Sequence, residues 1–124
     1  MSKNIIILGS TGSIGRSTLN SINSTKNLKV ILLSANKNIL ELLKQCLKYK
    51  VKNAIIEDKK KYIKYKKIFK EKNIKLHLGL KNIDKILNKR ITYCVNSITG
   101  IDGLEPTLKI IPYTNKILIA NKES

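Results

Sequence analysis

The sequence predicts an α/β fold in which a mostly parallel sheet is doubly wound, with helices on both of its faces. Two observations predict this class. Short apolar segments alternate with amphipathic segments along the chain, and the apolar ones are hydrophobic throughout, as strands buried on both faces are. In addition, a glycine-rich segment at 9–15, GSTGSIG, separates the first apolar segment from the first helical pattern, which is typical of Rossmann-like folds.

Six segments are predicted to be strands because they are short, apolar and bounded by polar residues. They are Ile5–Leu8, Leu28–Leu33, Asn53–Ile56, Ile74–Leu78, Thr92–Asn96 and Lys116–Ala120. Parallel strands joined by right-handed crossovers favour the order 3-2-1-4-5, with further strands at the edge.

The first two predicted helices follow the first two strands. One continues from the glycines through Arg16–Ile22. In the other, the apolar residues at 39, 42, 43, 46 and 47 follow the spacing of an amphipathic helix. Asn38 and Glu41 resemble a capping box at its start, so we expect this helix to begin directly after Asn38.

Three more helices are predicted further along the chain. Asp58 is a candidate cap for a lysine-rich helix that extends to about Lys72, and Asn82–Asn88 forms a short helix. Pro106 suits a first helical turn, and Pro112 closes that helix.

The bulk composition indicates one domain, or one piece of a larger protein, of 124 residues. No apolar stretch approaches the roughly 18 residues of a membrane span, and we expect no signal peptide. Cys46 and Cys94 lie in apolar patterns without metal-ligand spacing. They are therefore predicted to be reduced core residues, which suits a cytoplasmic protein.

The net charge of +17 has two interpretations. One is a nucleic-acid-binding module. The other is a biased composition, because lysines occur in every segment. In the lysine-rich helix, Tyr62, Tyr65 and Phe69 fall on one face, so they are expected to face the core rather than bases. We therefore expect no specific nucleic-acid partner.

The glycine segment predicts a site for a nucleotide phosphate, with a purely structural turn as the alternative. Gly9 would make the turn, Gly12 would admit a pyrophosphate, and Gly15 would let the helix pack closely on the strand. Thr11 and Ser13 add hydroxyl donors. The N-terminus of the helix supplies unpaired N–H groups and a partial positive charge.

The end of the second predicted strand favours NADP over NAD. NAD-binding proteins place Asp or Glu there to bind the ribose, whereas this chain has SANKN at 34–38. No acid repels a 2′-phosphate, and Lys37 can pair with one. In the alternative interpretation, Asn38 is only the cap of the next helix. It can have both roles if its side chain caps the helix while the helix start faces the phosphate.

Four motifs together resemble one family. In order and spacing, GSTGSIGRSTL, a strand end of the form AxKN, VNSITGIDGLEPTL and ILIANKES are similar to the N-terminal NADPH-binding domain of 1-deoxy-D-xylulose 5-phosphate reductoisomerase. The resemblance covers the whole chain, and ANKES is its most specific part. It implies an isoprenoid-pathway oxidoreductase. Such an enzyme rearranges 1-deoxy-D-xylulose 5-phosphate and reduces it with NADPH to 2-C-methyl-D-erythritol 4-phosphate, using Mg²⁺ or Mn²⁺.

The resemblance also implies roles for individual residues. Substrate contact is implied for Lys122. Cofactor contact is implied for Thr11, Gly12, Ser13 and Ile14 at the pyrophosphate, for Asn36, Lys37 and Asn38 around the 2′-phosphate, and for Asn121 and Glu123 near the nicotinamide. The family usually has glycine where this chain has Asn36, and a side chain there either crowds the ribose or adds a hydrogen bond.

The resemblance further implies that the chain is the NADPH-binding domain, residues 1–124, of a longer enzyme. The metal carboxylates of the family lie beyond Ser124, so we expect no catalytic residue and no metal ligand within this chain, and no turnover by it alone. The complete enzyme is expected to be a cytoplasmic homodimer that binds no membrane. The alternative is the NADP-binding domain of another dehydrogenase with a GxTGxxG loop, for which ANKES is atypical.

Overall fold

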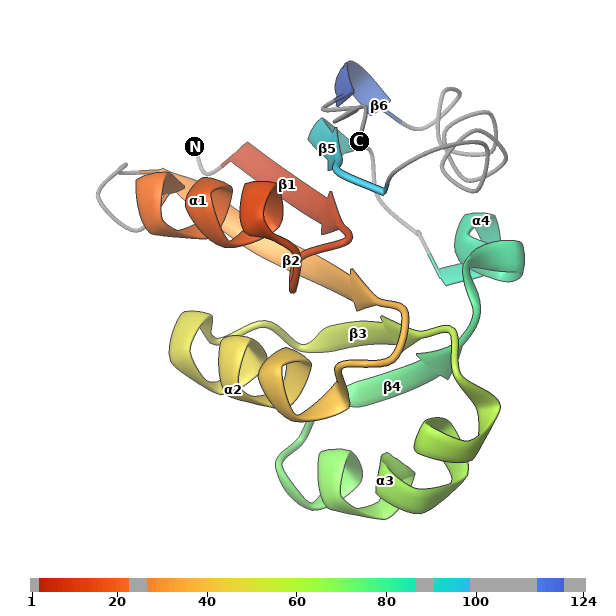
Figure 1. The fold of residues 1–124 in the computed structure, drawn as a ribbon. Helices are drawn as coiled ribbons and strands as arrows, with labels where there is room; N and C mark the ends of the chain where they lie inside the picture. The colour runs from red at the N-terminus through yellow and green to blue at the C-terminus, as the bar shows by residue number, and fades with distance from the viewer. Residues whose placement is uncertain (1–2, 23–26, 87–90, 99–113, 120–124) are drawn as a thin grey trace.

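The computed structural model describes residues 3–22, 27–86, 91–98 and 114–119 (Figure 1). Strands and helices alternate from the N-terminus. The elements are β1 (Lys3–Leu8), α1 (Ser13–Ile22), β2 (Leu28–Ala35), α2 (Ile39–Tyr49), β3 (Asn53–Ile56), α3 (Lys59–Glu71), β4 (Lys75–Leu78), the 3-10 turn η1 (Leu80–Asn82), α4 (Ile83–Ile86), β5 (Ile91–Asn96) and β6 (Thr114–Ile119). All six predicted strands are present, and the α/β class is confirmed. The helix predicted between Pro106 and Pro112 lies outside the described residues.

The six strands form one parallel sheet in the order β4-β3-β2-β1-β5-β6. The predicted order 3-2-1 is confirmed. Counted along the chain, however, the fourth strand does not lie beside β1, as a literal order 3-2-1-4-5 would have it. β4 is the additional edge strand beside β3, and β5 and β6 occupy the other side of β1. The crossover through α3 continues the winding in the same direction, and the chain moves to the other side of β1 only after β4.

Helices cover both faces of the sheet, as predicted. On one face, α1, α2 and α3 pack through Leu19, Leu42 and Phe69 against residues of β1, β2 and β3. On the other face, η1 and α4 pack through Leu80 and Ile83 against a second set of strand residues. Figure 1 shows α1, α2 and α3 along the same side of the sheet. Because both faces are covered, the central strand β1 is buried from Ile5 to Leu8.

Two predicted caps start helices where the sequence indicated. The side chain of Asn38 accepts a hydrogen bond from the Glu41 N–H at 3.3 Å, and the side chain of Asp58 accepts one from the Lys61 N–H at 3.1 Å. Each satisfies one of the N–H groups that a helix start leaves unpaired. The Glu41 carboxylate lies 4.0 Å from Nε of Arg16, so α2 has an added ion pair rather than the reciprocal arm of a capping box.

The aromatic side chains of the lysine-rich helix α3 face the core, as predicted. Phe69 is fully buried, and Tyr62 and Tyr65 pack against the same cluster. Lys66 and Lys64 lie over these two tyrosine rings, with Nζ 5.8 and 5.6 Å from the ring centroids. Rings that pack against the core and lie near lysine ammonium groups are poorly placed for bases to stack on them.

Two of the three glycines of the loop are required by the fold. Gly9 has φ +75°, a conformation that favours glycine, and a Cβ there would lie 3.0 Å from Oγ of Ser97. At Gly15, a Cβ would overlap the Gly9 carbonyl oxygen and lie 2.5 Å from Cα of Ser10. The first turn of α1 therefore packs backbone to backbone on Gly9 and Ser10, the two residues that directly follow β1. The roles predicted for Gly9 and Gly15 are confirmed.

Replacing Gly15 by alanine is expected to destabilise the fold even though alanine is the better helix former. The new methyl group meets backbone that cannot move aside, so we expect Gly15→Ala to lower the free energy of unfolding by about 2 kcal/mol or more. Gly12→Ala is the matched control, because its nearest neighbour is 3.7 Å away, and it should change that free energy by less than about 0.5 kcal/mol. Urea denaturation of both variants measures the difference. Equal stabilities would contradict the packing role of Gly15.

Both cysteines are buried in the core, as predicted, one on each face of the sheet. Burial raises the pKa of the Cys46 thiol and of the Cys94 thiol to about 12, since a thiolate would lose its hydration there.

The raised pKa predicts that neither thiol reacts in the folded chain. At pH 8, four units below the pKa, about one molecule in 10⁴ would carry a thiolate, and burial blocks access to it. We therefore expect no measurable reaction with an aromatic disulfide reagent over minutes in native buffer, and two equivalents of reaction in 6 M guanidinium. Rapid modification of one thiol in native buffer would show that the core around it opens.

Candidate functional site

The loop Gly9–Gly12 lies at the carboxyl edge of the sheet, between β1 and the start of α1. Strand β1, which leads into the loop, is flanked by β2 on one side and by β5 on the other. The connections on the two sides of β1 pass over opposite faces of the sheet. In open α/β sheets, a ligand crevice forms where the winding direction changes in this way.

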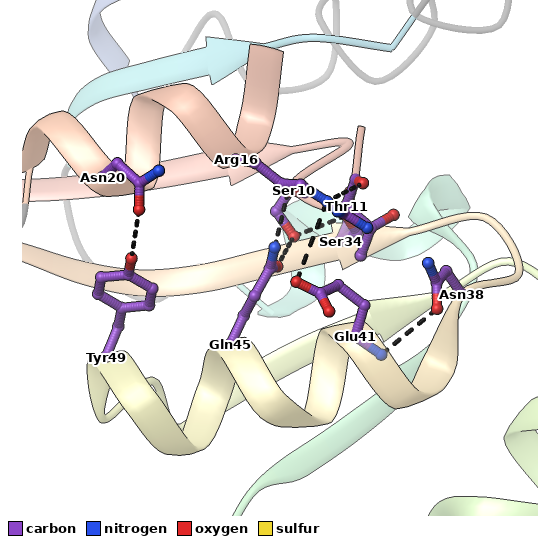
Figure 2. A network of polar contacts seen from close by, with 9 residues as sticks. All are labelled: Ser10, Thr11, Arg16, Asn20, Ser34, Asn38, Glu41, Gln45 and Tyr49. Carbon is purple, nitrogen blue, oxygen red and sulfur yellow. Dashed lines mark hydrogen bonds and ion pairs between the residues drawn. The ribbon is translucent and has the colours of Figure 1, made fainter. Parts of the chain in front are cut away.

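A buried network of polar groups fixes the loop on its β2 side (Figure 2). Ser10 donates its N–H to the Ser34 carbonyl at 2.8 Å, and the Gly9 N–H donates to Oγ of Ser34 at 3.0 Å. The amide of Gln45, from α2, contacts Ser10 twice. Its Oε1 accepts from the Ser10 hydroxyl at 2.7 Å, and its Nε2 donates to the Ser10 carbonyl at 2.9 Å. All three side chains are buried, and their polar atoms pair with one another or with the backbone of the loop.

A single side chain fixes the loop on its β5 side. The Ser97 hydroxyl lies 2.7 Å from the carbonyl oxygen of Leu8 and 2.9 Å from that of Gly9, and these two acceptors share its single O–H. The Ser97 N–H also donates to the Leu8 carbonyl at 2.9 Å. The end of β1 and the start of the glycine loop are therefore held from both neighbouring strands.

The outer rim of the loop combines N–H donors with open space. Gly12 and Ser13 are exposed, and Thr11 and Ile14 are half-buried. A Cβ at Gly12 would meet no described protein atom closer than the Gly9 carbonyl oxygen, at 3.7 Å. Nothing in the packing of the described residues thus requires glycine at position 12. A group from outside the chain, approaching the N-terminus of α1, would require it.

The second candidate segment, Asn36–Asn38, follows β2 and is exposed at the same edge. Asn38 accepts from the first turn of α2 and so holds the helix start in place. Asn36 does not have a positive φ, and its carbonyl accepts from the Asp58 N–H at 3.0 Å. Glycine is therefore not required there for backbone reasons. Because β1 and β2 are paired and parallel, this segment and the glycine loop are neighbours.

Arg16 adds a cation between these two segments. Its Nε donates to the Thr11 carbonyl at 2.8 Å and lies 4.0 Å from Oε1 of Glu41. The two side chains are 52% and 26% exposed, so this pair contributes little stability. Together with the exposed Lys37, Arg16 makes the rim cationic, as an anion site requires.

Sequence reasoning missed Arg16 and all the residues of the buried network. The one available signal is a polar residue within an apolar pattern, as Gln45 is between Leu42 and Cys46. Asn121, Lys122 and Glu123 lie outside the described residues, so their roles stay predictions.

His77 is the one histidine of the chain, and it lies among the residues that the structure describes. The pKa of His77 is lowered by burial first and by Lys75 second, but His77 is on β4, at the far edge of the sheet. Within the same described ranges, no three His, Cys, Asp or Glu side chains gather to hold a metal ion. The helices described there include none that is long and apolar enough to cross a membrane.

A groove of about 590 Å³ follows the side of α1 toward β5, lined by Ile5, Ile22, Tyr93 and Val95 among others. Its lining also includes Ser13 and Ile14 of the rim, but neither Gly9–Gly12 nor Asn36–Asn38. The groove therefore meets the rim at the start of α1 and extends away from it along the helix.

Two kinds of comparison connect the chain to known proteins. The family model described as 1-deoxy-D-xylulose 5-phosphate reductoisomerase matches residues 5–124. Curated reductoisomerases of that name are 44% identical in Pelagibacter ubique and 43% identical in Buchnera aphidicola, in both cases over 98% of this chain. The chain spans only 32% of the length of each of these relatives.

Solved structures agree with the sequence matches. The reductoisomerase of Zymomonas mobilis in complex with NADPH has a TM-score of 0.86 at 28% identity, over 98% of this chain and 32% of that one. A reductoisomerase in complex with NADPH, fosmidomycin and magnesium has a TM-score of 0.85 at 26% identity, over 98% of this chain and 31% of the other. On this combined sequence and structural similarity, the chain belongs to the 1-deoxy-D-xylulose 5-phosphate reductoisomerase family and corresponds to the N-terminal domain of its members.

Proposed function

We propose that this chain is the NADPH-binding domain of a 1-deoxy-D-xylulose 5-phosphate reductoisomerase. The pyrophosphate would lie on the segment Thr11–Ile14, and the adenosine 2′-phosphate would lie against Asn36–Asn38. The observation that carries the proposal is the open space at Gly12, beside a helix N-terminus and within a cationic rim. The similarity to a reductoisomerase in complex with NADPH supports it.

The residues present fit this cofactor. The loop offers N–H and hydroxyl donors to a pyrophosphate, and a Cβ at Gly12 would project into the space from which that group approaches. Among the described acids near the rim, Glu41 is beside Arg16, Asp58 caps α3, and Glu57 accepts from the Leu80 N–H at 2.6 Å. Each of these carboxylates thus has a partner other than Lys37. Lys37 is therefore the charge available to a 2′-phosphate.

In the complete enzyme, NADPH would supply the hydride for the reduction that follows the rearrangement of 1-deoxy-D-xylulose 5-phosphate. We propose that Asn121 and Glu123 contact the cofactor near its nicotinamide half and that Lys122 contacts the substrate. A relative has been solved in complex with magnesium. We propose that Mg²⁺ or Mn²⁺ is held by carboxylates outside this chain, which on its own would bind NADPH without oxidising it.

The same proposal includes the setting of the complete enzyme, which would be a cytoplasmic homodimer. Two free, buried cysteines are compatible with a reducing compartment. The family membership removes the support for another GxTGxxG dehydrogenase. The packing of the α3 aromatics against the core removes the main support for a nucleic-acid-binding module.

The cofactor preference tests the role of Lys37. We expect the chain to bind NADPH about fivefold more tightly than NADH, which corresponds to about 1 kcal/mol for a partly exposed lysine–phosphate pair. Lys37→Ala should remove most of this preference, and moderate salt should weaken it. Calorimetric titration with both cofactors at two salt concentrations measures the effect.

A matched control removes the same charge elsewhere. Lys48 is exposed in the last turn of α2, away from the rim. Lys48→Ala should leave the preference as in the unaltered chain. If Lys37→Ala kept the full preference, or if both variants lost it equally, the assignment of Lys37 would be refuted.

Gly12→Val tests the pyrophosphate site. The branched side chain would occupy the space open at position 12, so we expect NADPH binding to weaken at least a hundredfold while the circular dichroism spectrum stays that of the folded chain. Ser17→Val, at an exposed position one turn further along α1, is the control and should bind normally. Retained binding by Gly12→Val would mean that the loop is only a structural turn.

A further inference from the structure

Helix α2 contacts the β1–α1 unit through three polar side chains spaced four residues apart, Glu41, Gln45 and Tyr49 (Figure 2). Residues at this spacing lie on one face of a helix. Their partners are Arg16, Ser10 and Asn20 in the same order. These three side chains, called the polar stripe of α2 below, connect α2 to the glycine loop and to α1.

The three contacts are unequal in strength. The Glu41–Arg16 pair is 4.0 Å long and exposed, and the Tyr49 hydroxyl lies 3.3 Å from Oδ1 of Asn20 at the surface. Gln45 is only 4% exposed, and its amide uses both of its polar atoms on Ser10. Two opposed hydrogen bonds to one residue fix both the distance and the orientation of that residue. Burial makes the loss of either bond costly.

Gln45 thereby connects the segment proposed to hold the pyrophosphate to the segment proposed to hold the adenosine 2′-phosphate. Ser10 directly precedes the segment Thr11–Ile14. Asn38 caps the helix that carries Gln45, seven residues earlier, about 10 Å along the helix axis. A helix is stiff over this length, so Gln45 and Asn38 keep a fixed separation. If Ser10 moves relative to Gln45, the pyrophosphate segment therefore moves relative to Asn36–Asn38.

We propose that Gln45 is a positioning residue for cofactor selectivity. It sets the separation between the pyrophosphate segment and the 2′-phosphate segment, so that one ligand can contact both at once. This inference rests on the proposed function. NADPH needs both segments, whereas NADH, which lacks the 2′-phosphate, needs chiefly the first. A change in the separation of the two segments would therefore weaken NADPH binding more than NADH binding.

The test is the ratio of the two dissociation constants in Gln45→Met, which keeps the length of the side chain and removes both hydrogen bonds. We expect the dissociation constant of NADPH to rise about tenfold and that of NADH to rise less than threefold, so that the preference for NADPH disappears. Ser10→Ala removes the hydroxyl contacts to Gln45 and to the Ser34 carbonyl but keeps the bond from Nε2 of Gln45 to the Ser10 carbonyl, and it should give an intermediate loss. In the double variant, the two losses should not add, because both act through one contact.

Two controls separate positioning from a general loss of stability. Cys46→Ala removes buried volume at the next residue without touching the network, and Tyr49→Phe removes the exposed contact of the stripe. Both should keep the unaltered ratio, even if Cys46→Ala lowers the melting temperature as much as Gln45→Met does. If Gln45→Met fails to fold, the ratio in Ser10→Ala decides the question.

A second measurement detects a change in the relative position of the two segments in the absence of cofactor. Amide resonances of Asn36–Asn38 in nuclear magnetic resonance spectra should shift in Gln45→Met and stay in place in Cys46→Ala. An unchanged NADPH to NADH ratio in folded Gln45→Met and in Ser10→Ala would overturn the inference, as would an equal change in Cys46→Ala. Failure of the unaltered chain to bind NADPH would refute the proposed function itself, and the inference with it.

Discussion

The structure depends on one close contact, the packing of the first turn of α1 on the two residues that directly follow β1. No side chain fits between them, since a Cβ at Gly15 would overlap the Gly9 carbonyl oxygen. This contact brings the N-terminus of α1 directly to the carboxyl edge of the sheet. It also places the partial positive charge of the helix at the rim of the loop, where an anion can reach it. A larger residue would separate helix from strand and move the donors away from the edge.

The same loop has an inner side that serves the fold and an outer side that is available to a ligand. On the inner side, Ser34 and Ser97 hold the end of β1 from its two neighbouring strands, and Gln45 holds Ser10 from α2. Buried polar groups stabilise a structure only when their hydrogen bonds are made, and here they pair with one another or with the backbone of the loop. On the outer side, the space at Gly12 is open, because a Cβ there would meet no described atom closer than the Gly9 carbonyl oxygen at 3.7 Å.

The large positive charge acts differently at the rim and on the rest of the surface. The lysines of α3 lie on a helix whose aromatic side chains pack against the core, with lysine ammonium groups near the tyrosine rings. That surface offers diffuse attraction to polyanions, which salt screens. At the rim, Arg16 lies beside the N–H donors at the start of α1, and Lys37 lies in the neighbouring segment Asn36–Asn38, so that charge is combined with oriented hydrogen-bond donors. Specific recognition of a phosphate requires that combination, and net charge alone does not provide it.

The sequence by itself determined the features that depend on neighbours along the chain. The strands, the caps Asn38 and Asp58, the inward face of α3 and the fold roles of Gly9 and Gly15 follow from local spacing, and the structure has them. Only the tertiary structure decided the edge position of β4 and the contacts of Ser10 with Ser34 and Gln45. Those contacts join residues 24 and 35 positions apart, and no local pattern specifies which buried polar groups will meet. The packing of β2 and α2 beside the loop between β1 and α1 selects those partners, because each must find a hydrogen bond once water is excluded.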